Sequence, residues 1–324
     1  MSERFLSSIS AAERRSPFSF CRGYFMIALL SALFCLIVTN SAWAQPPEVL
    51  WTQTYPTLSA IAMEATPDGG FLLAGDRSYG PFVWYAQLIK VDSVGSVEWS
   101  RGLPVPQNDI SRFRGVTPTT DGNVVATGYY AAYPSYNYNV FVVKFTPAGD
   151  TLWTRTYDLD HHDEADVVVA TPDGGCVITG YTRFIGGNTY TGDVLLLKLD
   201  TEGNVVWQRS YGTPLHDFAT DMVQDSSGNF FIAGYTEPLD SMADNSVRGL
   251  MMKASANGDS LWMRHYDVMD WTLLEGLAQM QDGGLIACGF GRQPGDNYAD
   301  VAVLRTDPQG NVLWQRVVGG YYAE

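Results

Sequence analysis

The stretch that decides the fold runs from Asp193 to Tyr211 and reads Asp-Val-Leu-Leu-Leu-Lys-Leu-Asp-Thr-Glu-Gly-Asn-Val-Val-Trp-Gln-Arg-Ser-Tyr. Its first half is an apolar run of strand length, and its second half alternates large side chains with polar ones. Between them, Gly203 stands where a type I turn with a G1 bulge needs a positive φ. The stretch therefore predicts a β-hairpin.

Copies of this hairpin recur along the chain. The tryptophan that marks each copy recurs at intervals of 48 to 55 residues, at Trp51, Trp99, Trp153, Trp207, Trp262 and Trp314. A glycine that follows a short apolar run keeps step with it, at Gly75, Gly128, Gly180, Gly234 and Gly289. A supersecondary unit repeated at this length must stack on its neighbours to bury its faces.

Each repeat contains four predicted strands and no segment with a useful helical period. In the third copy, a hairpin formed by 166–171 and 175–180 precedes the hairpin described above. Four-stranded antiparallel units of this length are blades of a β-propeller, whereas immunoglobulin-like domains would need about twice the length per unit. We predict an all-β propeller of five complete blades plus extra outer strands. The propeller domain spans 45–324, with blades at about 57–104, 105–158, 159–212, 213–267 and 268–319.

Two outer strands compete for the fifth blade. One is predicted at Val49–Tyr55, before the first blade, and the other at Leu313–Val318. We expect Leu313–Val318 to pair with the strand at Ala299–Asp307, because that connection is the shorter. The segment Val49–Tyr55 is then left near the first blade. We also expect the sequence to be part of a larger propeller with six or more blades.

Residues 1–44 are predicted to be a signal peptide. Basic residues precede an apolar run from Tyr24 to Val38, and Ala42-Trp-Ala44 has the small-x-small pattern of a cleavage site. We therefore expect a secreted or cell-surface protein with no transmembrane domain after cleavage. Removing the leader takes away four basic and two acidic side chains, which changes the formal net charge from −15 to −17. Such a surface repels phosphate backbones and excludes nucleic acid as a partner.

Three motifs resemble the repeats of secreted β-propeller proteins common in Bacteroidetes and related bacteria. They are Trp207-Gln-Arg-Ser-Tyr-Gly212, Thr171-Pro-Asp-Gly-Gly175 and the apolar strand Asp193–Asp200. The blade layout is also similar to that of quinoprotein dehydrogenases, whose outer strand carries a Trp after a Gly turn. The resemblance implies the fold and says little about activity. The chain lacks the adjacent Cys pair that those dehydrogenases place against their cofactor, so no quinone cofactor is predicted.

The main functional hypothesis is a binding module without catalytic residues, which recognises a glycan or a protein partner. In such a propeller the long, dissimilar connections lie on one rim, and unlike loops on a uniform scaffold are the usual location of binding. Tyrosines suit this role because they offer flat, amphipathic contact. The candidates on this rim are Tyr133, Tyr136, Tyr138, Tyr190 and Tyr298. The competing interpretation is that these side chains only pin their own loops.

The alternative hypothesis is a hydrolase or lyase that uses carboxylates and His162 or His216 in the central funnel. No known catalytic motif appears in the sequence. An acidic loop in the third repeat offers weak candidates for holding a divalent cation, at His161, His162 and Asp163. A solvated acidic loop is the other interpretation, because the spacing fits no EF-hand. No other cofactor is predicted.

Overall fold

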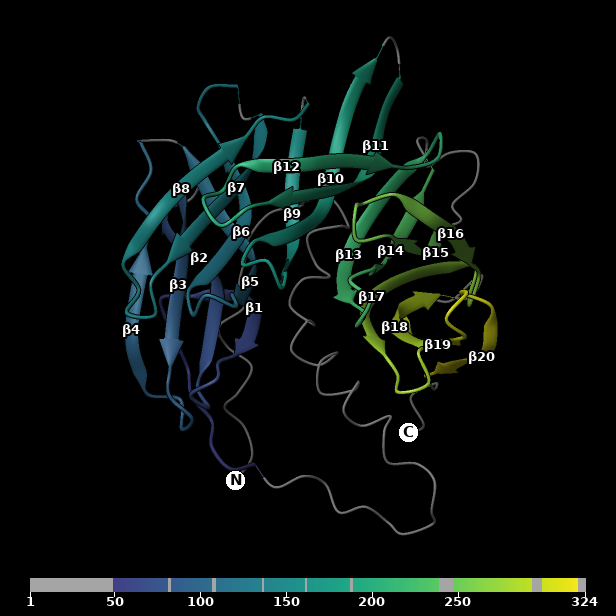
Figure 1. Cartoon of the computed structure of the whole chain (residues 1–324), viewed down its shortest axis with the longest axis horizontal. Helices are drawn as coiled ribbons and strands as arrows, with labels where there is room; N and C mark the ends of the chain where they lie inside the picture. The colour runs from purple at the N-terminus through teal and green to yellow at the C-terminus, as the bar shows by residue number, and fades with distance from the viewer. Residues whose placement is uncertain are drawn as a thin grey trace, which may run out of the picture. The chain divides into compact units, whose positions relative to one another are not determined.

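The computed structural model describes the chain at residues 49–80, 83–106, 109–135, 137–160, 162–186, 189–238, 247–292 and 299–319 (Figure 1). The described residues form twenty β-strands and contain no helix. Accordingly, they contain no helical segment that could cross a membrane.

The strands form five successive four-stranded antiparallel blades, so the predicted all-β propeller fold is confirmed (Figure 1). The first blade contains β1 (Ser59–Ala65), β2 (Phe71–Gly80), β3 (Val83–Val91) and β4 (Val97–Gly102). The second contains β5 (Ile110–Pro118), β6 (Val124–Ala131), β7 (Tyr138–Phe145) and β8 (Thr151–Tyr157). The third contains β9 (His162–Ala170), β10 (Cys176–Gly186), β11 (Thr189–Leu199) and β12 (Val205–Tyr211). The fourth contains β13 (His216–Gln224), β14 (Phe230–Glu237), β15 (Arg248–Ala254) and β16 (Ser260–Tyr266). The fifth contains β17 (Trp271–Gln279), β18 (Leu285–Arg292), β19 (Asp300–Thr306) and β20 (Val312–Val318).

The turns within each blade form as their residues dictate. Between β11 and β12, Gly203 has φ +81°, a conformation that glycine adopts without steric cost. The Asp200 carboxylate accepts hydrogen bonds from the backbone N–H of Glu202, at 3.0 Å, and of Asn204, at 2.7 Å. A side chain that bonds the backbone two and four residues on holds the turn closed, so this hairpin is specified locally.

The outer strand of each of the first four blades contacts the hairpin turn of the next blade. From β8, Trp153 Nε1 donates to the Thr201 carbonyl at 3.1 Å, and Tyr157 Oη donates to the Gly203 carbonyl at 2.6 Å. A Cβ on Gly203 would lie 3.1 Å from the Trp153 ring, so the glycine also makes room for the tryptophan. The tryptophans therefore act as packing wedges between blades.

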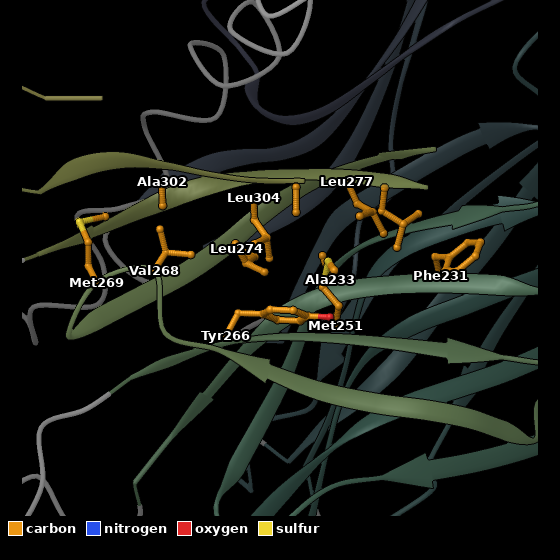
Figure 2. Packing of buried hydrophobic residues seen from close by; sticks show 12 residues of the cluster. Phe231, Ala233, Met251, Tyr266, Val268, Met269, Leu274, Leu277, Ala302 and Leu304 are labelled. Atoms are coloured by element: carbon orange, nitrogen blue, oxygen red, sulfur yellow. The ribbon is translucent and has the colours of Figure 1, made fainter. Parts of the chain in front are cut away.

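Buried apolar side chains fill the space between neighbouring blades. Figure 2 shows this packing between the fourth and fifth blades, where Ala233 and Met251 face Leu274, Ala302 and Leu304. All five are at most 1% exposed to solvent. Apolar burial of this kind is the main favourable term that holds stacked repeats together.

The competition for the fifth blade is resolved as expected, because β20 pairs with β19. The segment Val49–Tyr55 lies on the first blade instead, where Trp51 Nε1 donates to the Ser93 carbonyl at 3.1 Å and Tyr55 Oη to the Gly95 carbonyl at 2.7 Å. These are the contacts that β8 makes with the third blade. The prediction that this segment is itself a strand is wrong, since it is not paired with any described strand. Trp51 and Tyr55 therefore contact the hairpin turn although the backbone of their segment is not hydrogen-bonded to a neighbouring strand.

The far face of the fifth blade differs from its counterparts in the other blades. Val301 of β19 is 41% exposed, whereas Val140 and Val194 at the equivalent positions of the second and third blades are fully buried. Trp314 and Val318 of β20 are also exposed. Among the described residues, this face is not covered by another blade.

Candidate functional site

The candidate site lies on the first strand of each blade. Neighbouring first strands contact one another in the order β1, β5, β9, β13 and β17, so they form the inner row of the fold. Each carries a β-bulge at the same place, immediately after the residue that pairs with the landmark glycine of the second strand. Bulges redirect a side chain and are common beside functional sites. The residues at the bulge are Ile61, Arg114, Asp166, Thr220 and Glu275.

The bulge position brings a buried arginine to two carboxylates of the next blade. Arg114 is only 7% exposed. Its Nη2 lies 3.3 Å from Glu164 Oε2, and its Nη1 lies 3.8 Å from Asp166 Oδ1. The Cζ atom of Arg114 lies over the Tyr129 ring, 5.0 Å from its centre. One cation is thus shared between two acidic side chains in a place with little water.

Glu164 and Asp166 have different ionisation behaviour although they share this cation. Burial would raise the pKa of Glu164, but the hydrogen bond with His162, whose Nε2 lies 3.0 Å from Oε1, and the charge of Arg114 hold it below its usual value. For Asp166, burial outweighs the more distant Arg114, and the charge of Glu164 adds to it, so the pKa rises to about 6. Asp166 therefore exchanges its proton close to neutral pH.

Two further carboxyls extend the group into the fourth and fifth blades. Burial raises the pKa of Glu275 to about 7, and the charges of Asp166 and Asp221 contribute. Burial also raises the pKa of Asp221 to about 7, although its carboxylate accepts hydrogen bonds from the backbone N–H of Met222 at 2.8 Å and of Leu277 at 2.7 Å. Asp221 thereby joins two blades. In the described part of the chain, no cation pairs with Glu275.

A continuous row of rings lies beside these carboxyls and crosses three blades. Neighbouring ring centres are 4.4 to 6.1 Å apart, in the order Tyr129, Tyr138, His162, Tyr181, Phe218 and Tyr235. At its end, burial raises the pKa of Tyr235 well above its usual value. The charge of Glu237 adds to this, followed by the charges of Glu275, Asp166 and Glu164. The row therefore packs the second, third and fourth blades against one another, and its Tyr235 end lies near the carboxyls.

Of the tyrosines predicted to bind a ligand, Tyr138 and Tyr133 have described side chains. Tyr138 is half-buried, because its ring packs between Tyr129 and His162. The ring is therefore held within the fold and is not presented to a ligand. Tyr133 is 58% exposed, and its backbone N–H donates to Asp109 Oδ1 at 2.9 Å. Tyr130 donates to the other oxygen of the same buried carboxylate. The loop that carries Tyr133 is thus anchored.

The remaining candidates lie partly or wholly outside the described residues. Tyr136, Tyr298 and His161 are not among them. Tyr190 is described by its backbone alone, which pairs with Ile185 in the hairpin of β10 and β11.

Asp163, a predicted metal ligand, uses its carboxylate to hold the backbone of its loop. It is fully buried, and its Oδ2 accepts hydrogen bonds from the backbone N–H of Leu159 at 2.8 Å and of Asp160 at 2.9 Å. Its Oδ1 accepts from Thr182 Oγ1 at 2.5 Å. Asp217 closes the matching connection of the next blade in the same way. Within the described ranges, no three His, Cys, Asp or Glu side chains are placed to hold a metal ion.

The two histidines proposed for catalysis lie on adjacent inner strands. His162 of β9 bonds Glu164, as described above, and contacts Tyr138. His216 of β13 has a buried Nδ1 without a hydrogen-bond partner, and burial together with the charge of Arg183 lowers its pKa. Neither histidine forms an ion pair with Asp166 or Glu275.

The sequence holds a signal for the bulge residues, although they belong to no known motif. Each of them stands fourteen residues before the glycine landmark of its own repeat, as Asp166 does before Gly180 and Glu275 before Gly289. The residue types at this position differ from blade to blade, while an apolar residue precedes each of them. A variable position on a repeated inner strand is where a repeat scaffold has room for function.

Comparisons with known proteins give no family for this chain. No protein-family model matches it, and no curated protein matches it. Among solved structures, it is similar to a protein assigned as an exo-β-1,3-galactanase from Bifidobacterium bifidum, with 14% identity over 82% of this chain and 93% of that chain, at a TM-score of 0.46. A variant of B. megaterium levansucrase matches with 10% identity over 81% and 83% of the two chains, at 0.45. The Neurospora crassa Pan2 WD40 domain matches with 9% identity over 83% and 81%, at 0.43. With TM-scores below 0.5, these likenesses indicate neither an activity nor a ligand for this chain.

The raised pKa values predict that the fold loses stability as the pH rises. Asp166, Asp221 and Glu275 bind a proton more tightly in the folded chain than in the unfolded chain. Their contribution is fully present below about pH 4 and is lost as the pH rises through about 6 to 7. We expect the double variant Asp166→Asn, Glu275→Gln to remove about 4 kcal/mol of this loss between pH 5 and 8, since one pKa unit corresponds to about 1.4 kcal/mol.

Urea unfolding at pH 5, 6, 7 and 8 measures this effect. The matched control is Glu202→Gln, which changes an exposed carboxylate in the turn after β11. An unchanged slope of unfolding free energy against pH in the double variant would show that these carboxyls ionise normally.

Proposed function

We propose that this chain is an exported β-propeller enzyme that cleaves glycosidic bonds with the inner-strand carboxyls of Asp166 and Glu275. One observation carries the proposal. The Asp166 and Glu275 carboxyls are half-buried at equivalent bulge positions of the third and fifth blades. Asp166 lies beside the Arg114 cation, whereas no cation of the described residues pairs with Glu275. This pair of carboxyls favours the enzyme hypothesis over the binding module, which was the main hypothesis from the sequence.

Glycoside cleavage needs two carboxyl groups in opposite protonation states. A protonated acid donates to the oxygen of the leaving sugar, while an ionised carboxylate attacks the anomeric carbon or activates water. Asp166 faces the Arg114 cation, which favours its ionised form, so it suits the role of nucleophile or base. Glu275 keeps its proton to higher pH and suits the role of acid. A lyase reaction would use the same ionised carboxyl as its base.

The surroundings suit a sugar better than an acyl substrate. Thr220, the bulge residue between the two carboxyls along the chain, donates its hydroxyl to the Leu274 carbonyl at 2.6 Å and is therefore engaged in structure rather than set up as a nucleophile. The nearby aromatic row supplies flat apolar contacts and phenolic hydroxyls, which sugars use for binding. Acid catalysis by raised-pKa carboxyls is a general solution for glycosidic bonds.

A binding module that uses the long-loop rim is the second candidate, and Tyr133 favours it. Its ring is exposed while its backbone is held by Asp109, so little entropy would be lost on contact with a ligand. This candidate predicts binding without turnover, which Tyr133→Ala would abolish.

A polysaccharide screen separates the two functions. Purified mature chain would be incubated with neutral and acidic polysaccharides, with and without a chelator. Released reducing ends report hydrolysis, ultraviolet absorbance of unsaturated products reports a lyase, and calorimetry reports binding. We expect turnover in the wild type and in Tyr133→Ala, but not in Glu275→Gln. Saturable binding with no turnover on any substrate would contradict the enzyme proposal and support the binding module.

A further inference from the structure

Arg114 occupies in the second blade the position that Asp166 and Glu275 occupy in the third and fifth. It is the cation that forms an ion pair with the candidate base Asp166. Its neighbours suggest a role beyond holding two blades together.

The contacts of Arg114 with its two carboxylates are unequal. The 3.3 Å contact of Nη2 with Glu164 is a hydrogen bond, whereas the 3.8 Å separation of Nη1 from Asp166 Oδ1 is too long for one. Glu164 alone therefore satisfies the structural need of a buried guanidinium for an ionic partner. The effect of Arg114 on Asp166 acts through charge across a short, poorly hydrated distance.

The other candidate carboxyl has no such neighbour. The charged and titratable groups that face Glu275 are Asp166 of β9, Asp221 of β13 and Tyr235 of β14. Those that face Asp166 are Arg114 of β5, Glu164 of its own strand, Glu275 of β17 and Tyr235. The asymmetry between the two carboxyls is therefore the presence of Arg114 beside one of them.

We propose that Arg114 is a positioning residue that favours the ionised form of Asp166 over that of Glu275, because its guanidinium lies 3.8 Å from the first of these two carboxyls and forms no ion pair with the second. The names of the roles rest on the proposed function. The order of ionisation is a property of the folded chain whether or not it is an enzyme.

Carboxyl titration by NMR tests this order directly. Protein labelled with ¹³C at Asp and Glu side chains would be titrated, with the two signals assigned by Asp166→Asn and Glu275→Gln. In Arg114→Met we expect the midpoint of Asp166 to rise by about one pH unit or more, since an opposite charge at such distances lowers a carboxyl pKa by about 1 to 3 units. It would then meet or pass the midpoint of Glu275. Arg114→Lys keeps the charge and should keep the order.

Arg112→Met is the matched control. Arg112 lies two residues earlier on β5, pairs with Asp76 at 3.4 Å and lies over the Trp84 ring, so its loss should leave the Asp166 midpoint almost unchanged. If Arg114→Met does not fold, Glu164→Gln tests the same charge effect, because it removes the other acidic neighbour of Arg114. It leaves Asp166 as the remaining acidic neighbour of Arg114, so the midpoint of Asp166 should fall.

The outcomes distinguish this inference from the proposed function. A midpoint of Asp166 that stays within about 0.3 unit of wild type in folded Arg114→Met, or in Glu164→Gln if only that variant folds, overturns the inference, whatever the activity. A shifted midpoint in a protein that cleaves no glycan supports the inference and removes the proposed function. If the chain is active, the acidic limb of kcat/KM should move to higher pH in Arg114→Met and stay in place in Arg112→Met.

Discussion

Replacing Glu275 with Gln is expected to lower kcat/KM on the substrate found in the screen by about 10²- to 10⁴-fold, the range that general acid catalysis contributes. The amide cannot donate a proton to the leaving oxygen, whereas its size matches that of the acid. The melting temperature should stay the same or rise, because the amide removes the repulsion that Asp166 and Asp221 exert on Glu275. Initial rates and thermal unfolding of the same preparation measure both quantities.

Asp166→Asn should cause a loss of similar size, and the double variant should lose little more, because the two groups act as a unit. Glu202→Gln, which alters an exposed carboxylate far along the sheet from the bulge, should keep full activity. Retention of wild-type rates by Glu275→Gln would assign the chemistry to other residues. A loss of activity accompanied by unfolding would leave Asp166→Asn as the deciding variant.

The largest effect on stability is expected from Asp217→Ala. The Asp217 carboxylate is fully buried and accepts hydrogen bonds from the backbone and hydroxyl of Thr213 and from the hydroxyl of Thr236. Its removal leaves these donors without an acceptor in a dry place. We expect a loss of about 3 kcal/mol in unfolding free energy, in the range seen when one partner of a buried polar network is removed. Urea unfolding at pH 6 measures it.

Asp163→Ala should cost about as much, because Asp163 makes the matching contacts in the third blade. Asp158→Ala, an exposed carboxylate of the same connection, should change stability by less than about 0.5 kcal/mol. A chelator should leave the wild-type melting temperature unchanged, since the Asp163 oxygens are occupied by protein donors. A chelator-induced fall that disappears in Asp163→Ala would instead assign Asp163 to a cation site.

The sequence by itself determined the blade. The hairpin from Asp193 to Tyr211 could be predicted because its signals are local: an Asp that bonds its own turn, a Gly at positive φ and a period-two alternation around Trp207. The repetition of the blade also followed from the regular spacing of the tryptophans. Both depend on interactions within a few residues or on their repetition.

The candidate site was decided by the tertiary structure. Arg114, Asp166 and Glu275 are separated by whole blades along the chain, and only the stacking of the inner strands and the shared bulge brings them into one electrostatic group. The same stacking pinned Tyr138 between Tyr129 and His162, and it used the Asp163 carboxylate to close a loop. Residue type and spacing carry no information on burial or on neighbours from other blades. Those two quantities decide whether a carboxyl exchanges its proton near neutral pH or holds the backbone in place.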